Sequence, residues 1–349
     1  METRTVPNTK ISKRQFLQYS GGAALATGVP AFVGVGAANA AGLKTVEMQL
    51  GWLASNGQLG EVVAQAKGFY EAEGVELKIT PGGPNVDGVG SVAAGRAEVG
   101  QISSSPSVML ARAAGIPIKA FAAGYQKHPF TYFSLPEDPI REPKDMIGKT
   151  IATQPTAHIL LKALLAANDI SEDDVEIVNM GSDMNQLMTG QAAAVTGWLT
   201  NIAALDVLGE ERVDLMLWDT GIQLYATVYY ATDETIEDEA ETLAGFTRAT
   251  ARGWHYVREN PEEAVDLLIA AYPNMDREAE IRAVEQVMSF VFTDATAESG
   301  WGTMNHANWE TQIAAYADLG QFDGDAPTVD EVMTLKILEM TADARKEVS

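Results

Sequence analysis

Apolar residues follow two periodicities along the chain, and segments of the two kinds alternate as far as residue 198. Residues 46–50 alternate between apolar and polar positions as a half-buried strand does, whereas residues 59–72 repeat apolar positions with the spacing of a helix. Strands that alternate with helices of about ten residues predict βα units and a parallel sheet. The expected strands are 46–50, 73–79, 98–102, 116–123, 148–153, 175–180 and 192–198, and the expected helices are 59–72, 86–94, 106–114, 157–168 and 184–189.

The alternation stops and restarts at YQKHPFTYFSLPEDPI, and it ends at the aromatic, β-rich run IQLYATVYYATDE, after which almost only helical patterns follow. Two connections, near residues 127–136 and 223–233, would then join two lobes. Lobe one would combine residues 41–130 with 230–349, and lobe two would span residues 131–229. Ligands of open α/β sheets bind beyond the carboxyl ends of the strands, so both sheets should line one cleft, and two extended connections would let the lobes rotate about a hinge.

Residues 1–40 have the order of an export signal. Lys13 and Arg14 lie in a charged segment, a weakly apolar run follows, and Ala38-Asn39-Ala40 forms a small-x-small cleavage site. The pattern Ser-Lys-Arg-x-Phe-Leu resembles a twin-arginine signal with lysine in the first arginine position, and an ordinary Sec signal is the alternative. We expect a mature chain of about 309 residues that begins at Ala41, a length that favours two lobes over one domain.

Composition restricts the compartment and the chemistry. The sequence has no cysteine, which excludes disulfides, thiolate catalysis, cysteine metal sites and the lipid-bearing cysteine of a lipoprotein. An exported chain without such an anchor fits a Gram-negative periplasm. The formal net charge of -24 argues against binding nucleic acid or anionic lipid through the net field. The acidic residues are scattered, which is typical of a solvated surface.

Three stretches carry a family resemblance: LGWLASNGQLGEVVAQAKGFYEAEGVELKITPGGPNVDGVGSVAAGRAEVG, PKDMIGKTIAT and TGWLTN. They resemble periplasmic solute-binding proteins for thiamine precursors, riboflavin, alkanesulfonates, taurine and nitrate. The resemblance covers residues 45 to 260. It implies an α/β, two-lobed type II periplasmic binding protein fold, with parallel-type sheets, flanking helices and two crossover hinge segments. It also implies partnership with the permease and ATPase of an ABC importer.

Three consecutive serines lie where a predicted strand meets a predicted helix. Ser105 followed by Pro106 is a good N-cap and N1 pair, so Ser105 could cap the helix or contact a ligand. Ser103 and Ser104 are not needed as caps, and a strand end that opens onto a helix N-terminus offers free N–H groups to an electron-rich ligand atom. We expect Ser103 and Ser104 to face the cleft.

Other polar and aromatic residues fall at equivalent junctions. Trp52 and Trp198 follow strands of opposite lobes and could stack on a planar ligand, whereas Trp254, Trp301 and Trp309 lie in the helical region and should belong to the core. His158 could contact a ligand or lie on the surface of a first helical turn. The candidate ligand-binding residues are Trp52, Asn56, Ser103, Ser104, Ser105, Tyr125, Gln154, Thr156, His158, Ser182, Trp198, Asn201 and Tyr225.

The expected function is delivery of a small heteroaromatic or nitrogen-rich solute, thiamine-pyrimidine-like or riboflavin-like. The alternative is an alkanesulfonate, taurine or nitrate-type anion. Thiamine-pyrimidine binders of the family tend to carry a glutamate shortly after the lobe-two aromatic. Thr200 and Asn201 stand there instead, which argues against a cationic pyrimidine. Arg96, Arg112 and Lys127 are the nearest basic residues and are not at clear loop tips, which argues against small strong anions.

The remaining expectations concern catalysis and partners. Eukaryotic relatives of this fold that make the thiamine pyrimidine carry a cysteine-rich metal motif. This chain has no cysteine and begins with an export-like signal, so we expect no enzyme activity. His128, His255 and His306 lack metal-ligand spacing, and we expect neither a metal nor a cofactor. We expect a monomeric, soluble periplasmic receptor that binds no nucleic acid and does not insert into the membrane. A sensory partner of a receptor kinase is a further class that the sequence does not separate from transport.

Overall fold

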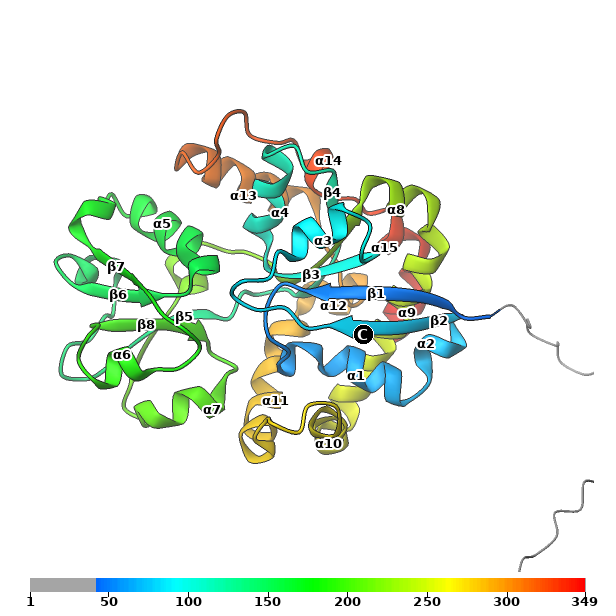
Figure 1. Cartoon of the computed structure of the whole chain (residues 1–349), viewed down its shortest axis with the longest axis horizontal. Helices are drawn as coiled ribbons and strands as arrows, with labels where there is room; N and C mark the ends of the chain where they lie inside the picture. The colour runs from blue at the N-terminus through cyan, green and yellow to red at the C-terminus, as the bar shows by residue number, and fades with distance from the viewer. Residues whose placement is uncertain (1–41, 349) are drawn as a thin grey trace, which may run out of the picture. The chain divides into compact units, whose positions relative to one another are not determined.

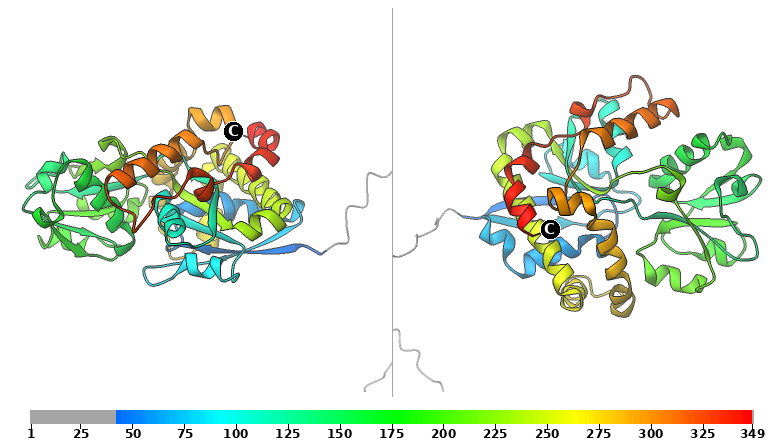
Figure 2. Two further views of the ribbon diagram at one scale, coloured as in Figure 1. Left: turned by 90° about the horizontal axis from the view of Figure 1, so that it is seen from above. Right: turned by 180° about the vertical axis from the view of Figure 1, so that it is seen from behind.

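The computed structural model describes residues 42–348, so the predicted export signal and its cleavage site lie outside the described residues. This part of the chain folds around two five-stranded sheets with flanking helices (Figures 1 and 2). We refer to the first sheet with its helices as the first lobe and to the second sheet with its helices as the second lobe. None of the helices in residues 42–348 is long and apolar enough to cross a membrane.

The first sheet has the strand order β2-β1-β3-β10-β4, and the second has the order β7-β6-β8-β5-β9. Strands β1, β2 and β3 are mutually parallel, as are β6, β7 and β8. The strands are β1 (Lys44–Leu50), β2 (Val75–Thr80), β3 (Val99–Ser104), β4 (Ile118–Tyr125), β5 (Phe130–Ser134), β6 (Thr150–Thr153), β7 (Glu176–Asn179), β8 (Ala194–Trp198), β9 (Val213–Met216) and β10 (Ala226–Thr232).

Helices surround both sheets and make up most of the chain after β10. In the first lobe α1 packs against α9 and α10, and α3 and α4 pack against β3 and β10. The helices are α1 (Leu59–Ala66), α2 (Phe69–Ala72), α3 (Gly88–Ala93), α4 (Ser105–Ala113), α5 (His158–Ala167), α6 (Asn185–Met188), α7 (Ile202–Leu205), α8 (Asp233–Asp238), α9 (Ala240–Glu259), α10 (Pro261–Ala271), α11 (Arg277–Val291), α12 (Asp294–Ser299), α13 (His306–Asp318), α14 (Val329–Val332), α15 (Lys336–Met340) and α16 (Ala342–Glu347).

The sheets are mixed, which corrects the predicted parallel type. Strand β10 runs antiparallel to both β3 and β4, and β5 runs antiparallel to both β8 and β9. Neither β5 nor β9 was predicted. All five residues of Phe130–Ser134 are buried, so they lack the alternation that marks a half-buried strand, and prolines flank the segment on both sides.

The connections between the sheets are shorter than the predicted crossovers. The chain leaves the first sheet at Tyr125 and enters the second at Phe130, and it leaves the second at Met216 and returns at Ala226. The predicted segments 127–136 and 223–233 therefore each include a whole strand, β5 and β10 respectively. Residues 126–129 and 217–225 are the connecting segments, and residues 217–220 of the second form a 3-10 turn.

One predicted helix is divided in two. Residues 59–72 form α1 and α2, because Gly68 adopts the left-handed conformation with φ of 70° and ends the helical path after Lys67. Residues other than glycine pay a steric penalty in this conformation, so a glycine fits the break.

The core of the first lobe contains the three tryptophans that were predicted to be buried: Trp254, Trp301 and Trp309 are each 0% exposed. Trp254 on α9 lies against α1 at Gly60, where an added Cβ would come within 2.3 Å of the indole ring. The absence of a side chain at this glycine is therefore required for the contact between α1 and α9.

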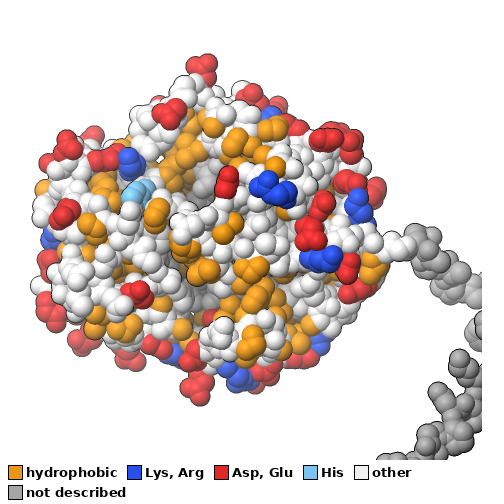
Figure 3. Space-filling view, viewed as in Figure 1, with side chains coloured by type: hydrophobic (Ala, Val, Ile, Leu, Met, Phe, Trp, Pro, Cys, Tyr) orange, Lys and Arg blue, Asp and Glu red, His pale blue; other side chains and the backbone are white. Residues whose placement is uncertain are grey.

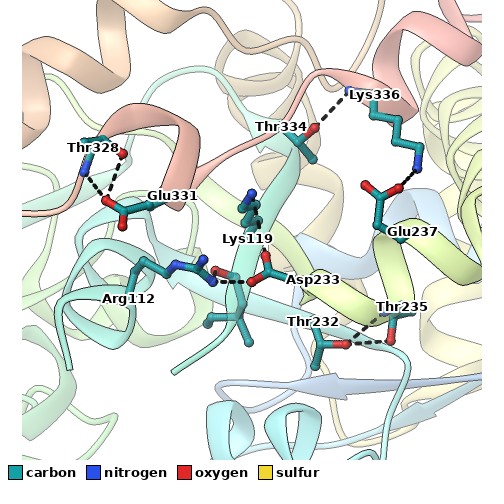
Figure 4. A network of polar contacts seen from close by, with 11 residues as sticks. Arg112, Lys119, Thr232, Asp233, Thr235, Glu237, Thr328, Glu331, Thr334 and Lys336 are labelled. Carbon is teal, nitrogen blue, oxygen red and sulfur yellow. Dashed lines mark hydrogen bonds and ion pairs between the residues drawn. The ribbon is translucent and has the colours of Figure 1, made fainter. Parts of the chain in front are cut away.

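Polar contacts fasten the last helices to the first lobe (Figure 4). Arg112 on α4 pairs with Asp233 at the start of α8, at 2.7 Å, and Lys336 of α15 pairs with Glu237 of α8, also at 2.7 Å. Glu331 of α14 accepts hydrogen bonds from both the backbone and the hydroxyl of Thr328. The Lys336–Glu237 pair thus connects α8 to the last segment of the chain, and the Arg112–Asp233 pair connects α8 to α4.

Candidate functional site

A cleft of about 660 Å³ lies between the two lobes and is lined by residues of both. This volume lies within the range of small-molecule sites, about 300–1,000 Å³. Its walls come from the loop after β1 and the end of β3 in the first lobe, the starts of α3 and α11, and the loops after β6, β7 and β8 in the second lobe. The strand ends thus meet at one cleft, as the sequence indicated.

Most of the candidate residues lie in the wall of this cleft. Those that line it are Trp52, Asn56, Ser103, Ser104, Gln154, Thr156, Ser182, Trp198 and Asn201. They come from both lobes, and all of them follow or end a strand in the sequence.

Ser105 and Tyr225 lie outside the cleft and contact each other. The Ser105 hydroxyl donates to Gln312 Oε1 at 2.5 Å and accepts the backbone N–H of Tyr225 at 3.2 Å. The Tyr225 hydroxyl accepts the backbone N–H of Asn305, and its ring packs against Trp309. Both side chains therefore join β10 and α4 to the C-terminal helices and are not available to a ligand.

Tyr125 and His158 also lie outside the cleft lining. Tyr125 is 0% exposed at the end of β4, and its ring stacks on Phe290 and packs behind Trp198. His158 opens α5 and its Nε2 is buried without a hydrogen-bond partner. Tyr125 thus supports a cleft residue from behind, whereas the imidazole of His158 belongs to the second lobe.

The serine junction has a different cap from the one predicted. Strand β3 continues to Ser104, helix α4 begins at Ser105, and Ser104 is the N-cap residue but makes no side-chain capping bond. The Ser104 hydroxyl is buried, lacks a hydrogen-bond partner and lies in the cleft wall. A buried hydroxyl without a partner is costly, so this oxygen is a place where a polar ligand atom would be stabilised.

Aromatic side chains from both lobes border the cleft. Trp52 is half-buried in the loop after β1, and Trp198 is half-buried at the end of β8. The Trp198 ring has its centroid 5.6 Å from that of Tyr125 and 5.7 Å from that of His128, so its orientation is fixed by packing. Phe130 and Tyr230 also line the cleft.

His128 lines the cleft and was considered in the sequence only as a possible metal ligand. Its Nδ1 accepts the backbone N–H of Phe130 at 3.2 Å, and its buried Nε2 lies on the side of the cleft wall. Burial lowers the pKa of His128 to about 3, against the opposing effect of a hydrogen bond with the Ser103 backbone, so the ring is neutral. Because Nδ1 accepts a hydrogen bond, the proton of the neutral ring is on Nε2. His128 thus offers one N–H donor at the first inter-lobe connection, and that position next to Pro129 was the signal available in the sequence.

Carboxylates reach the cleft from elements that the sequence did not associate with it. Asp87 caps α3, Asp276 caps α11, and Glu280 lies one turn into α11. Burial raises the pKa of Glu280, while a hydrogen bond from Asn56 Nδ2 at 2.9 Å opposes that rise. No local pattern marks α11 as part of the site, because it belongs to the long helical region far from the strand ends in sequence.

Asn56 also connects the lobes. Its Nδ2 donates to the backbone oxygen of Thr200 at 2.9 Å as well as to Glu280. Nearby, Arg282 of α11 forms a two-pronged ion pair with Asp206 of the second lobe, at 3.0 and 2.5 Å. The cleft is therefore closed at this edge by polar contacts between the lobes.

The sequence matches the family described as NMT1/THI5 like over residues 56–264. It is 27% identical over 285 residues to the formylaminopyrimidine-binding protein of Halalkalibacterium halodurans, covering 78% of this chain and 84% of that protein. It is 28% identical to the riboflavin-binding protein RibY of Chloroflexus aurantiacus, covering 71% and 73%. It is 24% identical to the 4-amino-5-hydroxymethyl-2-methylpyrimidine phosphate synthase of Legionella pneumophila, covering 66% and 74%.

Solved structures share the fold. The alkanesulfonate-binding protein SsuA of Xanthomonas axonopodis pv. citri, bound to MOPS, has a TM-score of 0.64 at 14% identity, covering 84% of this chain and 100% of that one. The aliphatic sulphonate-binding protein SsuA of Escherichia coli has a TM-score of 0.61 at 14% identity, covering 85% and 99%. Both are named as sulfonate-binding proteins, and the second also as periplasmic; at this identity the likeness establishes the two-lobed fold alone.

Proposed function

Since this chain belongs to the NMT1/THI5-like family, we propose that it is a solute-binding protein that delivers a small heteroaromatic or nitrogen-rich solute to an ABC import permease. The names of two relatives, a formylaminopyrimidine-binding and a riboflavin-binding protein, support this class of solute. Of the thirteen candidate residues, we propose that those in the cleft wall contact the solute. The other four are proposed to support the wall or the lobes around it instead: Ser105, Tyr125, His158 and Tyr225.

The observation that carries the choice of solute is the chemistry of the cleft wall. Asp87, Asp276 and Glu280 bring carboxylates to the cleft, while Trp52 and Trp198 offer ring faces. Carboxylates repel a sulfonate or nitrate and accept hydrogen bonds from amino or amidine groups, and ring faces stack on a flat heterocycle. The cleft therefore favours an aminopyrimidine-like or flavin-like ring over the small-anion alternative.

The acidic wall also changes the interpretation of the loop after Trp198. Thr200 and Asn201 stand where pyrimidine binders tend to have a glutamate, and this argued against a cationic pyrimidine. In the structure the first lobe supplies carboxylates to the same cleft from α3 and α11. A basic aminopyrimidine is thus compatible with this site through acids contributed by the opposite lobe.

We include no catalytic step in this function. One relative is named as a synthase, whereas two are named as binding proteins, and the cleft wall offers hydrogen-bond and stacking groups without a nucleophilic cysteine anywhere in the sequence. Within residues 42–348 the acidic and histidine side chains form no cluster suited to a metal ion. Recovery of an unchanged solute after incubation with the protein, measured by mass spectrometry, is the expected outcome.

We also propose that the protein acts in the periplasm; the signal-like residues 1–40 and the fold shared with a periplasmic sulphonate-binding protein support this location. Protein recovered from the periplasm should have the intact mass of a chain that begins at Ala41. Whether that chain serves a permease or also a receptor kinase would follow from which membrane protein it co-purifies with.

A thermal-shift titration tests the choice of solute. A formylaminopyrimidine or riboflavin should raise the melting temperature, since a ligand at a hundred times its dissociation constant stabilises the native state by ~2.7 kcal/mol. Taurine and nitrate should leave it unchanged. The Glu280→Gln variant distinguishes the two ring compounds, because it should weaken binding of a basic pyrimidine but not of riboflavin. A shift with taurine or nitrate and none with the ring compounds would contradict the proposal.

A further inference from the structure

Glu61 is a fully buried carboxyl group in the interior of the first lobe, one helical turn from the cleft. It lies on α1 with 0% exposure. Its Oε1 accepts hydrogen bonds from the Tyr229 hydroxyl at 2.5 Å and from Gln101 Nε2 at 2.9 Å, while its Oε2 is buried without a partner. Burying a carboxyl group without a neighbouring cation has a large desolvation cost. The hydrogen bonds to Glu61 must offset part of this cost, and their arrangement indicates what the group does.

A chain of hydrogen bonds connects Glu61 to the cleft, and in each bond the donor lies on the cleft side and the acceptor on the Glu61 side. Gln101 Oε1 accepts from Gln58 Nε2 at 2.6 Å, and Gln58 Oε1 accepts from the backbone N–H of Ser55 at 2.8 Å. The Ser55 N–H can only donate and an ionised Glu61 can only accept, so the orientation of both glutamine amides is dictated from the two ends. Aligned hydrogen bonds of this kind polarise and strengthen one another.

This series of bonds ends in a wall of the cleft. Gln58 and Gln101 both line it, and residues Ser55–Gln58 form the short turn that carries Asn56. Asn56 in turn reaches Thr200 of the second lobe at 2.9 Å. The turn is therefore held from inside by Glu61 and makes contact outward with the opposite lobe.

We propose that Glu61 is a positioning residue of the cleft: as a hydrogen-bond acceptor, it fixes the amides of Gln101 and Gln58 and thereby holds the Ser55–Gln58 turn where Asn56 can meet the second lobe. Its role in binding rests on the proposed function, but the position of the turn is measurable without any solute. Failure of one proposal is thus distinguishable from failure of the other.

The surroundings of Glu61 shift its pKa, so its protonation state depends on the same contacts. Burial raises the pKa of Glu61 to about 7, and the hydrogen bonds from Tyr229 and Gln101 oppose that rise. The titratable groups on which its charge acts are tyrosines, and burial together with that charge raises the pKa of each. They are Tyr70 of α2, Tyr125 of β4, Tyr229 of β10 and Tyr272 after α10.

The sign of the pH effect follows from that raised pKa. The unfolded chain releases the Glu61 proton near pH 4.5 and the folded chain near pH 7, so stability from this group is present below pH 4.5 and is lost as pH rises to about 7. His128 acts in the opposite sense, because its lowered pKa removes stability as pH falls below 6.5. The melting temperature of a Glu61 variant at each pH is therefore compared with that of the unchanged protein at the same pH, so that the contribution of His128 cancels.

Three substitutions separate the acceptor from the packing and from the charge. Glu61→Gln keeps an acceptor oxygen and removes the charge, Glu61→Leu removes both, and Tyr229→Phe removes one donor that favours the ionised form. Glu71→Gln, at an exposed position on α2, is the matched control. Each protein is examined by hydrogen–deuterium exchange at residues 52–58 and by melting temperature from pH 4.5 to 8.

In Glu61→Leu we expect exchange in residues 52–58 to become about tenfold faster while α9 and the strands of the first sheet keep their protection. In Glu61→Gln the turn should keep its protection and the Glu61-dependent part of the pH profile should disappear. In Tyr229→Phe that part should move to higher pH. Unchanged exchange in Glu61→Leu would overturn the proposal, as would a turn that loosens equally in Glu61→Gln, since loss of the negative charge, and not loss of the acceptor oxygen, would then explain it.

Discussion

Trp52 and Trp254 show how one residue type serves two purposes in the same lobe. Trp52 is half-buried in the cleft wall directly after β1, where a polar loop surrounds it. Trp254 is fully buried on α9 and lies on the bare backbone of Gly60. The amount of ring surface that the folded protein already covers differs between the two sites, and so should the effect of removing each ring.

Trp52→Ala should weaken binding of the ring compounds that shift the melting temperature, while the solute-free protein should melt close to its usual temperature. Trp254→Ala should lower the stability of the solute-free protein by ~3–5 kcal/mol, the usual effect of removing a buried aromatic side chain. Thermal melts of both variants without solute, followed by titration, measure the two effects. A large loss of stability in Trp52→Ala with affinity intact would assign that ring to the core.

Residues at strand ends were predictable as cleft residues because position in a βα unit determines where they point. Ser103, Ser104 and Trp198 follow this rule. Glu280 and Asp87 reach the cleft from the beginnings of helices, and nothing in a single sequence states which helix lies over which strand end. Ser105 was predicted as a cap or a ligand contact, but the strand continues two residues further than its pattern indicated, to Ser104. The helix begins at Ser105, whose hydroxyl contacts Gln312.

At the scale of elements, the start of α4 places two adjacent serines in opposite circumstances. The Ser104 hydroxyl is buried at the cleft without a partner, whereas the Ser105 hydroxyl has two partners, Gln312 and the backbone of Tyr225. Pro106 follows in the first turn of the helix, where its missing N–H costs nothing. Substituting each serine by alanine therefore removes the same hydroxyl group from two different environments.

Ser104→Ala should leave the solute-free protein as stable as before, since no hydrogen bond is lost, and should weaken solute binding by ~0.5–1.5 kcal/mol. Ser105→Ala should lower stability by ~1–3 kcal/mol, because Gln312 and the Tyr225 N–H lose a buried partner. Denaturant unfolding and a solute titration on each variant measure these effects. Equal losses of stability in the two variants would mean that Ser104 has a partner in the folded protein.

Most elements of the two sheets could be predicted because their hydrophobic period is clear, and the missing ones fail for identifiable reasons. Strand β5 is buried along its whole length and so shows no alternation, and Val213–Met216 is a four-residue strand after a charged turn. The antiparallel placement of β10 depends on contacts between residues that lie about a hundred positions apart. Local patterns carry no information about such pairing.

At the scale of the molecule, the two lobes are connected by two chain segments and contact each other through two polar interactions at one edge of the cleft. The Arg282–Asp206 pair and the Asn56–Thr200 hydrogen bond lie on one edge of the cleft, and residues 126–129 and 217–225 join the sheets. Asp206 and Arg282 are about half exposed, so salt screens their attraction, and the Arg282 guanidinium lowers the pKa of Asp206. This pair should favour the arrangement in which the lobes touch.

Asp206→Asn should therefore increase the radius of gyration of the solute-free protein in small-angle scattering, and the unchanged protein should approach the same value in high salt. A solute that binds between the lobes should return both to the smaller radius. Asp266→Asn is the control, because Asp266 pairs with Arg277 at 2.6 Å within the first lobe. An equal radius for Asp206→Asn and the control at every salt concentration would count against closure at this edge.

The position of β10 also determines the order in which the protein can be assembled during synthesis. The second sheet is encoded by one continuous stretch, residues 130–216, whereas β10, which joins β3 to β4 in the first sheet, is complete only at Thr232. A growing chain that has passed Tyr125 must add about a hundred residues before this strand exists, which takes roughly 5–20 s at ~5–20 residues per second. During that interval β3 and β4 have unpaired backbone edges, and the lobe that begins first in the sequence is completed second. Any factor that shields nascent chains from aggregation is therefore needed most while residues 126–232 are being made.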